Sequence, residues 1–177
     1  MGNIIKIESA EILSALKDTT RQYFVGNLSK PQTISFIKDD RLEIGISSYP
    51  GYFSEQPHIH SVATEYQYMI SGWTEYMNLE TGTIHVFKKG DFYAIEHKTP
   101  YSQKVKAGTN ILFIKVPSVN DKQIVKIDGE QLKWLEEKLR TVRTDYYYRN
   151  DAPAANSIKP ASAVAILNSN HELLLLH

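Results

Sequence analysis

The sequence contains no cysteine among its 177 residues. Disulfides, thiolate nucleophiles, cysteine-ligated zinc and iron–sulfur clusters are therefore excluded, and any metal must be bound through nitrogen and oxygen atoms. Net charge is also lacking, because 20 Lys and Arg residues balance 20 Asp and Glu residues. A basic surface for nucleic acid or anionic lipid is therefore not indicated.

Long apolar runs are missing as well. No stretch approaches the roughly 20 residues that cross a bilayer, and the first residues lack the charged-then-apolar pattern of a signal peptide. We therefore expect a cytoplasmic protein whose partners include neither membrane nor nucleic acid. Hydrophobic residues make up 42% and charged residues 23% of the chain, which is typical of a globular domain. Tyrosine dominates the aromatic residues, with eleven Tyr against six Phe and two Trp.

The middle of the chain has the pattern of short β-strands separated by glycine turns. Residues 42–47 alternate apolar and polar side chains, which predicts a half-buried strand. Further strands are predicted at 33–37, 65–70, 73–79, 83–88, 92–95, 102–106 and 110–116. Many short strands at this spacing favour an antiparallel sandwich or barrel.

Helical patterns flank the strands. Ser9 is a candidate cap for a short helix that carries Ile12, Leu13 and Leu16. A second amphipathic helix is predicted from about 129 to 143, with Asp128 as its cap. Residues 150–159 resemble a linker, and an apolar hairpin follows at 163–176. That hairpin is expected either to pack on the main body or a partner, or to be the start of a larger domain.

Two histidines are placed to act together. His58 and His60 alternate along a strand, so that both imidazoles project to one side, and Glu65 follows five residues later. If the strand pair folds back, the carboxylate faces the same cavity. Two imidazoles and a carboxylate suit Zn, Fe, Mn, Ni or Co. Gln67, in step with Glu65, is predicted to point inward too.

This part of the chain resembles the cupin superfamily. The stretch GYFSEQPHIHSVATEYQYMISG is similar to the first cupin motif at Gly51, His58, His60, Glu65 and Gly72. The stretch GDFYAIEHKTPYSQ is similar to the second at Gly90, Asp91, Ile95 and Pro100. The resemblance covers about residues 32–117. It implies an all-β fold, an antiparallel cupin or jelly-roll β-barrel with short flanking α-helices, over residues 1–148.

The resemblance also implies a metal site and shows a departure from it. Cupins commonly bind metal through two His, one Glu and a third His, and Tyr101 stands at the position of that third histidine. Tyr101 could supply a phenolate or only hydrogen-bond a ligand or water. His58, His60 and Glu65 are therefore the predicted ligands of a divalent transition metal (Zn, Fe, Mn or Ni). Tyr101 and His97 are candidate catalytic residues.

Several functions are consistent with these features. One is a metal-dependent enzyme (isomerase, epimerase or oxygenase-like) acting on a small polar molecule, with Gln67, Tyr101 and Gln103 as pocket residues. The alternative is a non-catalytic ligand-sensing or dimerisation module. Residues from about 158 to 177 weakly resemble the start of a Nudix hydrolase domain, so that 149–177 would be a linker and hairpin opening a truncated second domain. A homodimer is expected in either case.

Overall fold

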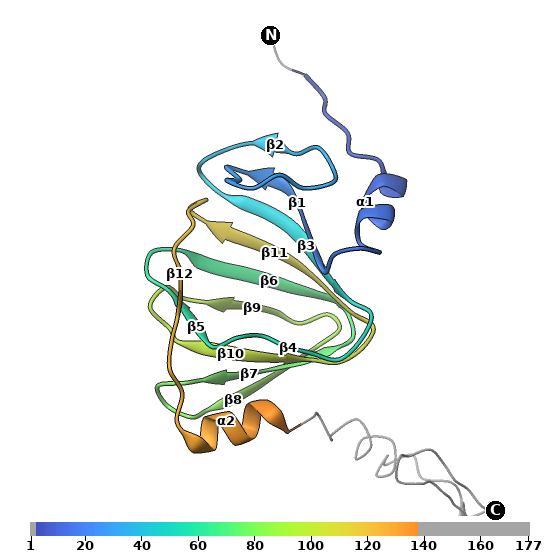
Figure 1. Ribbon diagram of the computed structural model, residues 1–177. Helices are drawn as coiled ribbons and strands as arrows, with labels where there is room; N and C mark the ends of the chain where they lie inside the picture. The colour runs from blue at the N-terminus through green and yellow to red at the C-terminus, as the bar shows by residue number, and fades with distance from the viewer. Residues whose placement is uncertain (1–2, 138–177) are drawn as a thin grey trace, which may run out of the picture. The chain divides into compact units, whose positions relative to one another are not determined.

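The structure is a computed structural model that describes residues 3–137 (Figure 1). The predicted linker and hairpin, the Nudix-like segment and the end of the second predicted helix lie outside these residues. The helices are α1 (Ser9–Ala15) and α2 (Gly129–Glu136). The strands are β1 (Arg21–Gly26), β2 (Ile37–Lys38), β3 (Glu43–Tyr49), β4 (Phe53–Ser54), β5 (His58–His60), β6 (Thr64–Ser71), β7 (Trp73–Asn78), β8 (Ile84–Lys88), β9 (Phe92–Ile95), β10 (Tyr101–Val105), β11 (Thr109–Val116) and β12 (Lys122–Ile124).

The strands form two sheets. One has the order β2-β1-β3-β11-β6-β9, and the other has the order β12-β5-β10-β7-β8 with β4 also paired to β10 (Figure 1). All pairs are antiparallel except the short pairing of β1 with β2. The chain crosses between the sheets repeatedly, so that sequence neighbours such as β5 and β6 lie in different sheets. The fold is a cupin-like jelly roll with two short helices, as predicted.

The interior between the sheets is lined largely by tyrosine. Buried apolar packing involves Tyr49, Met69, Tyr76, Tyr93, Tyr101, Val105 and Ile111. The hydroxyls of Tyr76 and Tyr93 both donate to the Gln67 side-chain oxygen, at 3.0 and 2.9 Å. Each buried phenol therefore has a partner, which lets polar tips line a cavity without an unpaired group.

Strand β3 buries its polar side. Glu43, Ser47 and Tyr49 are buried, whereas Ile44 and Ile46 are half-buried on the outer face. The alternation predicted the strand, but the apolar residues do not supply its inward face. A barrel that encloses polar side chains reverses the usual rule that the apolar side of a strand is the buried one.

The region before β3 differs from the prediction. Arg21–Gly26 forms β1, which was not predicted, and only Ile37 of the predicted 33–37 strand is in β2. The reason is a side chain. Gln32 accepts from the Tyr23 backbone N–H at 2.9 Å and donates to the Tyr23 carbonyl at 2.6 Å. Its amide occupies both backbone groups that a neighbouring strand would otherwise take.

One of the two predicted helix caps is confirmed and the other is wrong. Asp128 caps α2 as predicted, accepting from the backbone of Glu130 and Gln131 in a capping box. Ser9 is the first helical residue of α1 rather than its cap. Glu8 holds the cap position without a side-chain hydrogen bond. Among residues 3–137, neither helix has the length and apolar character needed to span a bilayer.

Candidate metal centre

Three predicted ligands meet inside the barrel. One nitrogen from each of His58 and His60 and one oxygen of Glu65 all lie within 4.8 Å of one another. The three residues are 1%, 8% and 4% exposed. Strand β5 presents both imidazoles, and β6 of the other sheet presents the carboxylate. The group therefore forms only where the two sheets face each other.

Strand β5 is short, and its neighbours hold it in register. His58 pairs with Tyr101 of β10 on one side and with Ile124 of β12 on the other. His60 pairs with Lys122 of β12. Strand β12 thus fixes the histidine pair from a part of the sequence some sixty residues away. No sequence pattern pointed to this role.

Hydrogen bonds orient both imidazole rings. The Nδ1 of His58 donates to the Gln56 carbonyl at 2.8 Å, because that oxygen can only accept. The Nδ1 of His60 lies 2.7 Å from a carboxylate oxygen of Asp121, to which it donates. Each ring therefore directs its Nε2 toward the cluster, where His60 Nε2 lies 3.3 Å from Glu65 Oε2. A carboxylate behind a ligating histidine is the usual second partner of such a ring in metal sites.

Tyr101 lies against the ligands at the position of the expected third histidine. Its hydroxyl donates to Glu65 Oε2 at 2.5 Å, and its ring centroid is 4.4 Å from that of His58. Burial, reinforced by the negative charge of Glu65, raises the pKa of Tyr101 well above its ordinary value. At neutral pH the residue is thus a protonated donor beside the cluster, rather than a phenolate.

The ligands themselves have displaced pKa values. Burial lowers the pKa of His58, so its ring is neutral at pH 7. Burial also opposes charge on His60, but hydrogen bonds and charges from Glu65 and Asp121 outweigh it and raise that pKa. Burial alone would raise the pKa of Glu65, yet His60, Arg21 and Tyr101 lower it to about 2. A carboxylate that is ionised while buried suits a cation.

Three residues of this region were not predicted. Asp121 holds His60, Glu55 lies with its Oε2 3.5 Å from His58 Nε2, and Arg21 lies near enough to Glu65 to lower its pKa. Glu55 is three residues before His58, so the sequence did contain a local signal for it. Asp121 and Arg21 are distant in sequence and carried none.

The other predicted residues occupy different surroundings. The side chain of Gln67 bonds to Tyr76 and Tyr93, and that of Gln103 donates to the hydroxyl of Thr74 at 2.9 Å. Both are buried, but neither lines the pockets described below. His97 is exposed in the turn after β9, and the structure does not bring it to the cluster.

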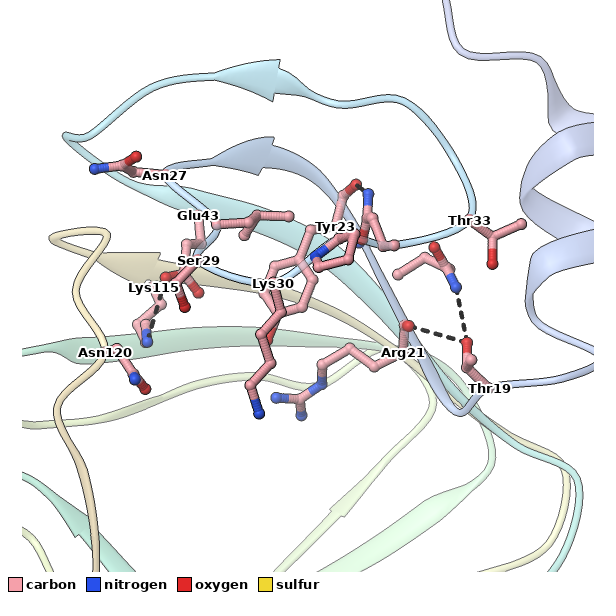
Figure 2. Close-up of a pocket in the computed structure, with 14 residues that line it drawn as sticks. Thr19, Arg21, Tyr23, Asn27, Ser29, Lys30, Thr33, Glu43, Lys115 and Asn120 are labelled. Carbon is pink, nitrogen blue, oxygen red and sulfur yellow. Dashed lines mark hydrogen bonds and ion pairs between the residues drawn. The ribbon is translucent and has the colours of Figure 1, made fainter.

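Two pockets flank this region. The larger, of about 680 Å³, lies among β1, β3, β11 and the 27–33 segment (Figure 2). It is lined by Thr19, Arg21, Gln22, Tyr23, Asn27, Leu28, Ser29, Lys30, Pro31, Gln32, Thr33, Glu43, Lys115 and Asn120. The smaller, of about 260 Å³, includes Tyr76 and Tyr101 in its wall.

Two charged residues that line the larger pocket act electrostatically on the candidate ligands. Arg21 lines it and lowers the pKa of Glu65, and Lys115 lines it and opposes charge on His60. Tyr101 connects the cluster to the smaller pocket, because the same residue bonds Glu65 and lines that pocket. The larger pocket therefore shares charged groups that act on the candidate ligands, and the smaller pocket shares Tyr101 with them.

Comparison with known proteins gives a likeness in fold. No family model matches the sequence, and no curated protein matches it. A protein with a double-stranded β-helix domain from Klebsiella pneumoniae aligns over 50% of this chain and 77% of its own, at 16% identity and a TM-score of 0.42. KdgF from Halomonas sp. aligns over 57% and 80%, at 15% identity and 0.44. DMSP lyase DddQ from Ruegeria pomeroyi aligns over 62% and 52%, at 14% identity and 0.47. At these values we infer nothing about activity.

The buried group itself resembles a cupin metal site. One imidazole nitrogen from each histidine and an ionised carboxylate are a donor set that first-row transition metals accept. The rings are held by hydrogen bonds on their far nitrogens, and the carboxylate is held by Tyr101. The residues present therefore fit a divalent transition metal.

Proposed function

We propose that this chain is a metal-dependent enzyme of the cupin type that acts on a small polar molecule. The observation that carries the proposal is the buried cluster of His58, His60 and Glu65, whose ligand atoms lie within 4.8 Å of one another. These residues would hold the divalent metal, with Zn, Fe, Mn and Ni all compatible with the donors.

The surroundings support a ligand set that is formed before metal arrives. Three outer partners, the Gln56 carbonyl, Asp121 and Tyr101, each hold one of the three ligands. Preorganised donors lose little freedom when a cation binds, which favours affinity. When bound, the metal would act as a Lewis acid that polarises a substrate oxygen or would bind oxygen.

Tyr101 is the residue proposed to move a proton. Its raised pKa keeps it protonated, and its hydroxyl is already fixed by Glu65. Tyr101 also lines the smaller pocket, a space that a substrate could enter. A fixed donor beside a Lewis acid suits isomerase or epimerase chemistry, in which a proton is moved.

A second function is favoured by the tyrosine itself. Tyr101 replaces a fourth metal donor with a neutral phenol that serves Glu65, which suits a barrel that binds a ligand without turning it over. Such a module would sense a small molecule and regulate an attached domain. The two functions differ in one test: Tyr101→Phe would abolish turnover in an enzyme, but it would leave ligand binding in a sensor largely intact.

Metal analysis tests the proposal directly. The full chain would be expressed separately with Zn, Fe, Mn or Ni, purified without chelator, and analysed for metal by mass spectrometry. We expect about one metal per chain for wild type and almost none for the His58→Ala/His60→Ala double variant. His85→Ala is the matched control, because His85 is an exposed histidine on β8.

The outcomes separate cleanly. Wild-type protein without stoichiometric metal under all four supplements would overturn the metal site. Circular dichroism on each variant shows whether the barrel is still folded. Tyr101→His is the companion variant, since a third imidazole at this position should slow metal loss to a chelator if residue 101 faces the metal.

A further inference from the structure

The larger pocket carries an excess of positive charge. Of its fourteen lining residues, Arg21, Lys30 and Lys115 are cationic and Glu43 is the only carboxylate. Glu43 is already engaged, because its Oε1 lies 3.4 Å from Lys115 Nζ. Two cations, Arg21 and Lys30, are therefore left without a carboxylate partner within ion-pair distance among residues 3–137.

Arg21 is positioned by a hydroxyl group and an aromatic ring rather than by a carboxylate. Its Nε donates to Ser47 at 2.9 Å, and its guanidinium lies 4.6 Å from the Phe113 ring centroid. The hydroxyl contact and the ring fix the plane of the group, and Glu55 and Glu65 act on its charge from beyond ion-pair distance. A fixed guanidinium presents a fork of N–H donors that matches a carboxylate or phosphate.

Lys30 adds a second positive charge to the pocket wall. It belongs to the 27–33 segment, which crosses over from β1 toward β2, and its side chain is exposed. Figure 2 shows Lys30 and Arg21 directed toward the same region of the pocket. An exposed lysine above a fixed arginine suits an anion that enters from solvent.

We propose that the pocket binds the anionic group of a small organic acid or phosphate ester, with Arg21 and Lys30 as its recognition residues. The inference rests on the proposed function in one respect, namely that the rest of the same molecule reaches the metal ligands. Arg21 is the residue common to both, because its side chain lines the pocket and its charge favours the ionised form of Glu65.

A purely structural role for Arg21 is the competing explanation. In that case Arg21 would only balance the buried charges of Glu65 and Glu55. Lys30 separates the two explanations, because it is exposed and has no described contact with either carboxylate. A loss of anion binding in a Lys30 variant would not follow from charge balance inside the barrel.

The test is calorimetric titration of the full chain with succinate, inorganic phosphate and succinamide. The uncharged succinamide controls for shape. We expect succinate or phosphate to bind wild type, with affinity about tenfold or more weaker in Arg21→Met and a few-fold weaker in Lys30→Met. Arg21→Lys keeps the charge but loses the fork, and should lie between. Lys89→Met, an exposed lysine in the β8–β9 turn, should leave the affinity unchanged.

Each result has a definite meaning. Failure of both anions to bind, equal binding of succinamide, or unchanged affinity in Lys30→Met and Arg21→Lys would overturn the proposal. If Arg21→Met does not fold, these last two variants carry the test alone. Titrations of metal-loaded and metal-stripped protein, with metal content measured on each, keep the two proposals separate. If the protein binds the anion but never takes up metal, the anion-binding inference stands and the proposed metal centre is wrong.

Discussion

Asp121 is not a candidate ligand itself, but it supports one of them. A substitution of Asp121 therefore tests the candidate metal centre without removing a ligand. One carboxylate oxygen accepts from His60 Nδ1 at 2.7 Å, and the other accepts from the backbone N–H groups of Val62 and Ala63 at 2.7 and 2.9 Å. Asp121 thus orients the second histidine and closes the turn that leads from β5 to β6. Asp121→Ala would remove all three bonds at once.

The size of the effect can be worked out in two ways from the same three bonds. Three hydrogen bonds at roughly 1 kcal/mol each amount to about 3 kcal/mol. Burial would raise the pKa of Asp121, but the backbone N–H groups and His60 lower it from 3.8 to about 2. At about 1.4 kcal/mol per pH unit, a shift of this size on a side chain that is only 8% exposed corresponds to roughly 2–3 kcal/mol. We expect Asp121→Ala to lower the free energy of unfolding by about 2–3 kcal/mol at pH 7.

The lowered pKa of Asp121 determines how its contribution to stability changes with pH. A carboxyl whose folded pKa lies below its unfolded value stabilises the fold above pH 4, and this contribution disappears as pH falls toward 2. The difference between wild type and Asp121→Ala in urea unfolding should therefore shrink over that range. Metal affinity, measured by chelator competition, should fall roughly 10–100-fold at pH 7.

The control is Asp91→Ala. Asp91 accepts from the Lys88 backbone N–H at 2.8 Å in the β8–β9 turn, away from the ligands. It should cost some stability but leave metal affinity unchanged. If Asp121→Ala changes metal affinity no more than Asp91→Ala does, Asp121 does not orient His60 and the reasoning is wrong.

Two further predictions concern the turns and the proton competition at the ligands. Gly72→Ala should lower the free energy of unfolding, measured by urea titration, by about 3 kcal/mol or more, because a Cβ at this position with φ +80° would lie 2.2 Å from Thr109 Oγ1. Gly82→Ala is the control, because Gly82 has φ +72° but open space around it, and this variant should cost only about 1 kcal/mol. In metal-free protein, NMR titration should give a pKa above 6.5 for His60 and below 6.5 for His58. Metal affinity should accordingly fall as pH drops through the His60 pKa, since the proton and the metal compete for the same nitrogen, and a pH-independent affinity between 5 and 8 would contradict this assignment.

Much of the sheet structure followed from local pattern. The strand at 92–95 was predicted with its observed bounds. The predicted strands at 73–79 and 110–116 differ from β7 and β11 by one residue at one end, and the strand at 65–70 is one residue shorter than β6 at each end. Their alternation placed Glu65 and Gln67 on the inner face, where both are buried. Period alone decides which side chains share a face, and this information is local.

Local pattern failed where side chains from distant segments intervened. Strand β1 was missed because its partner is partly a glutamine side chain, Gln32, rather than another strand. On β3 the apolar residues face outward, because the barrel interior requires polar groups such as Glu43 and Ser47. Which face of a strand is buried depends on the cavity that the strand borders, and the sequence of one strand does not contain that information.

The sequence alone therefore predicted which three residues cluster as candidate metal ligands, and it predicted the type of β-fold. His58 and His60 share a face by alternation, and the motif around them selected Glu65. Only the tertiary structure brought Asp121 behind His60 and Arg21 within electrostatic reach of Glu65. The physical reason is that His58 and His60 share a face through the regular period of one strand, whereas the positions of Asp121 and Arg21 depend on how distant segments and the two sheets pack.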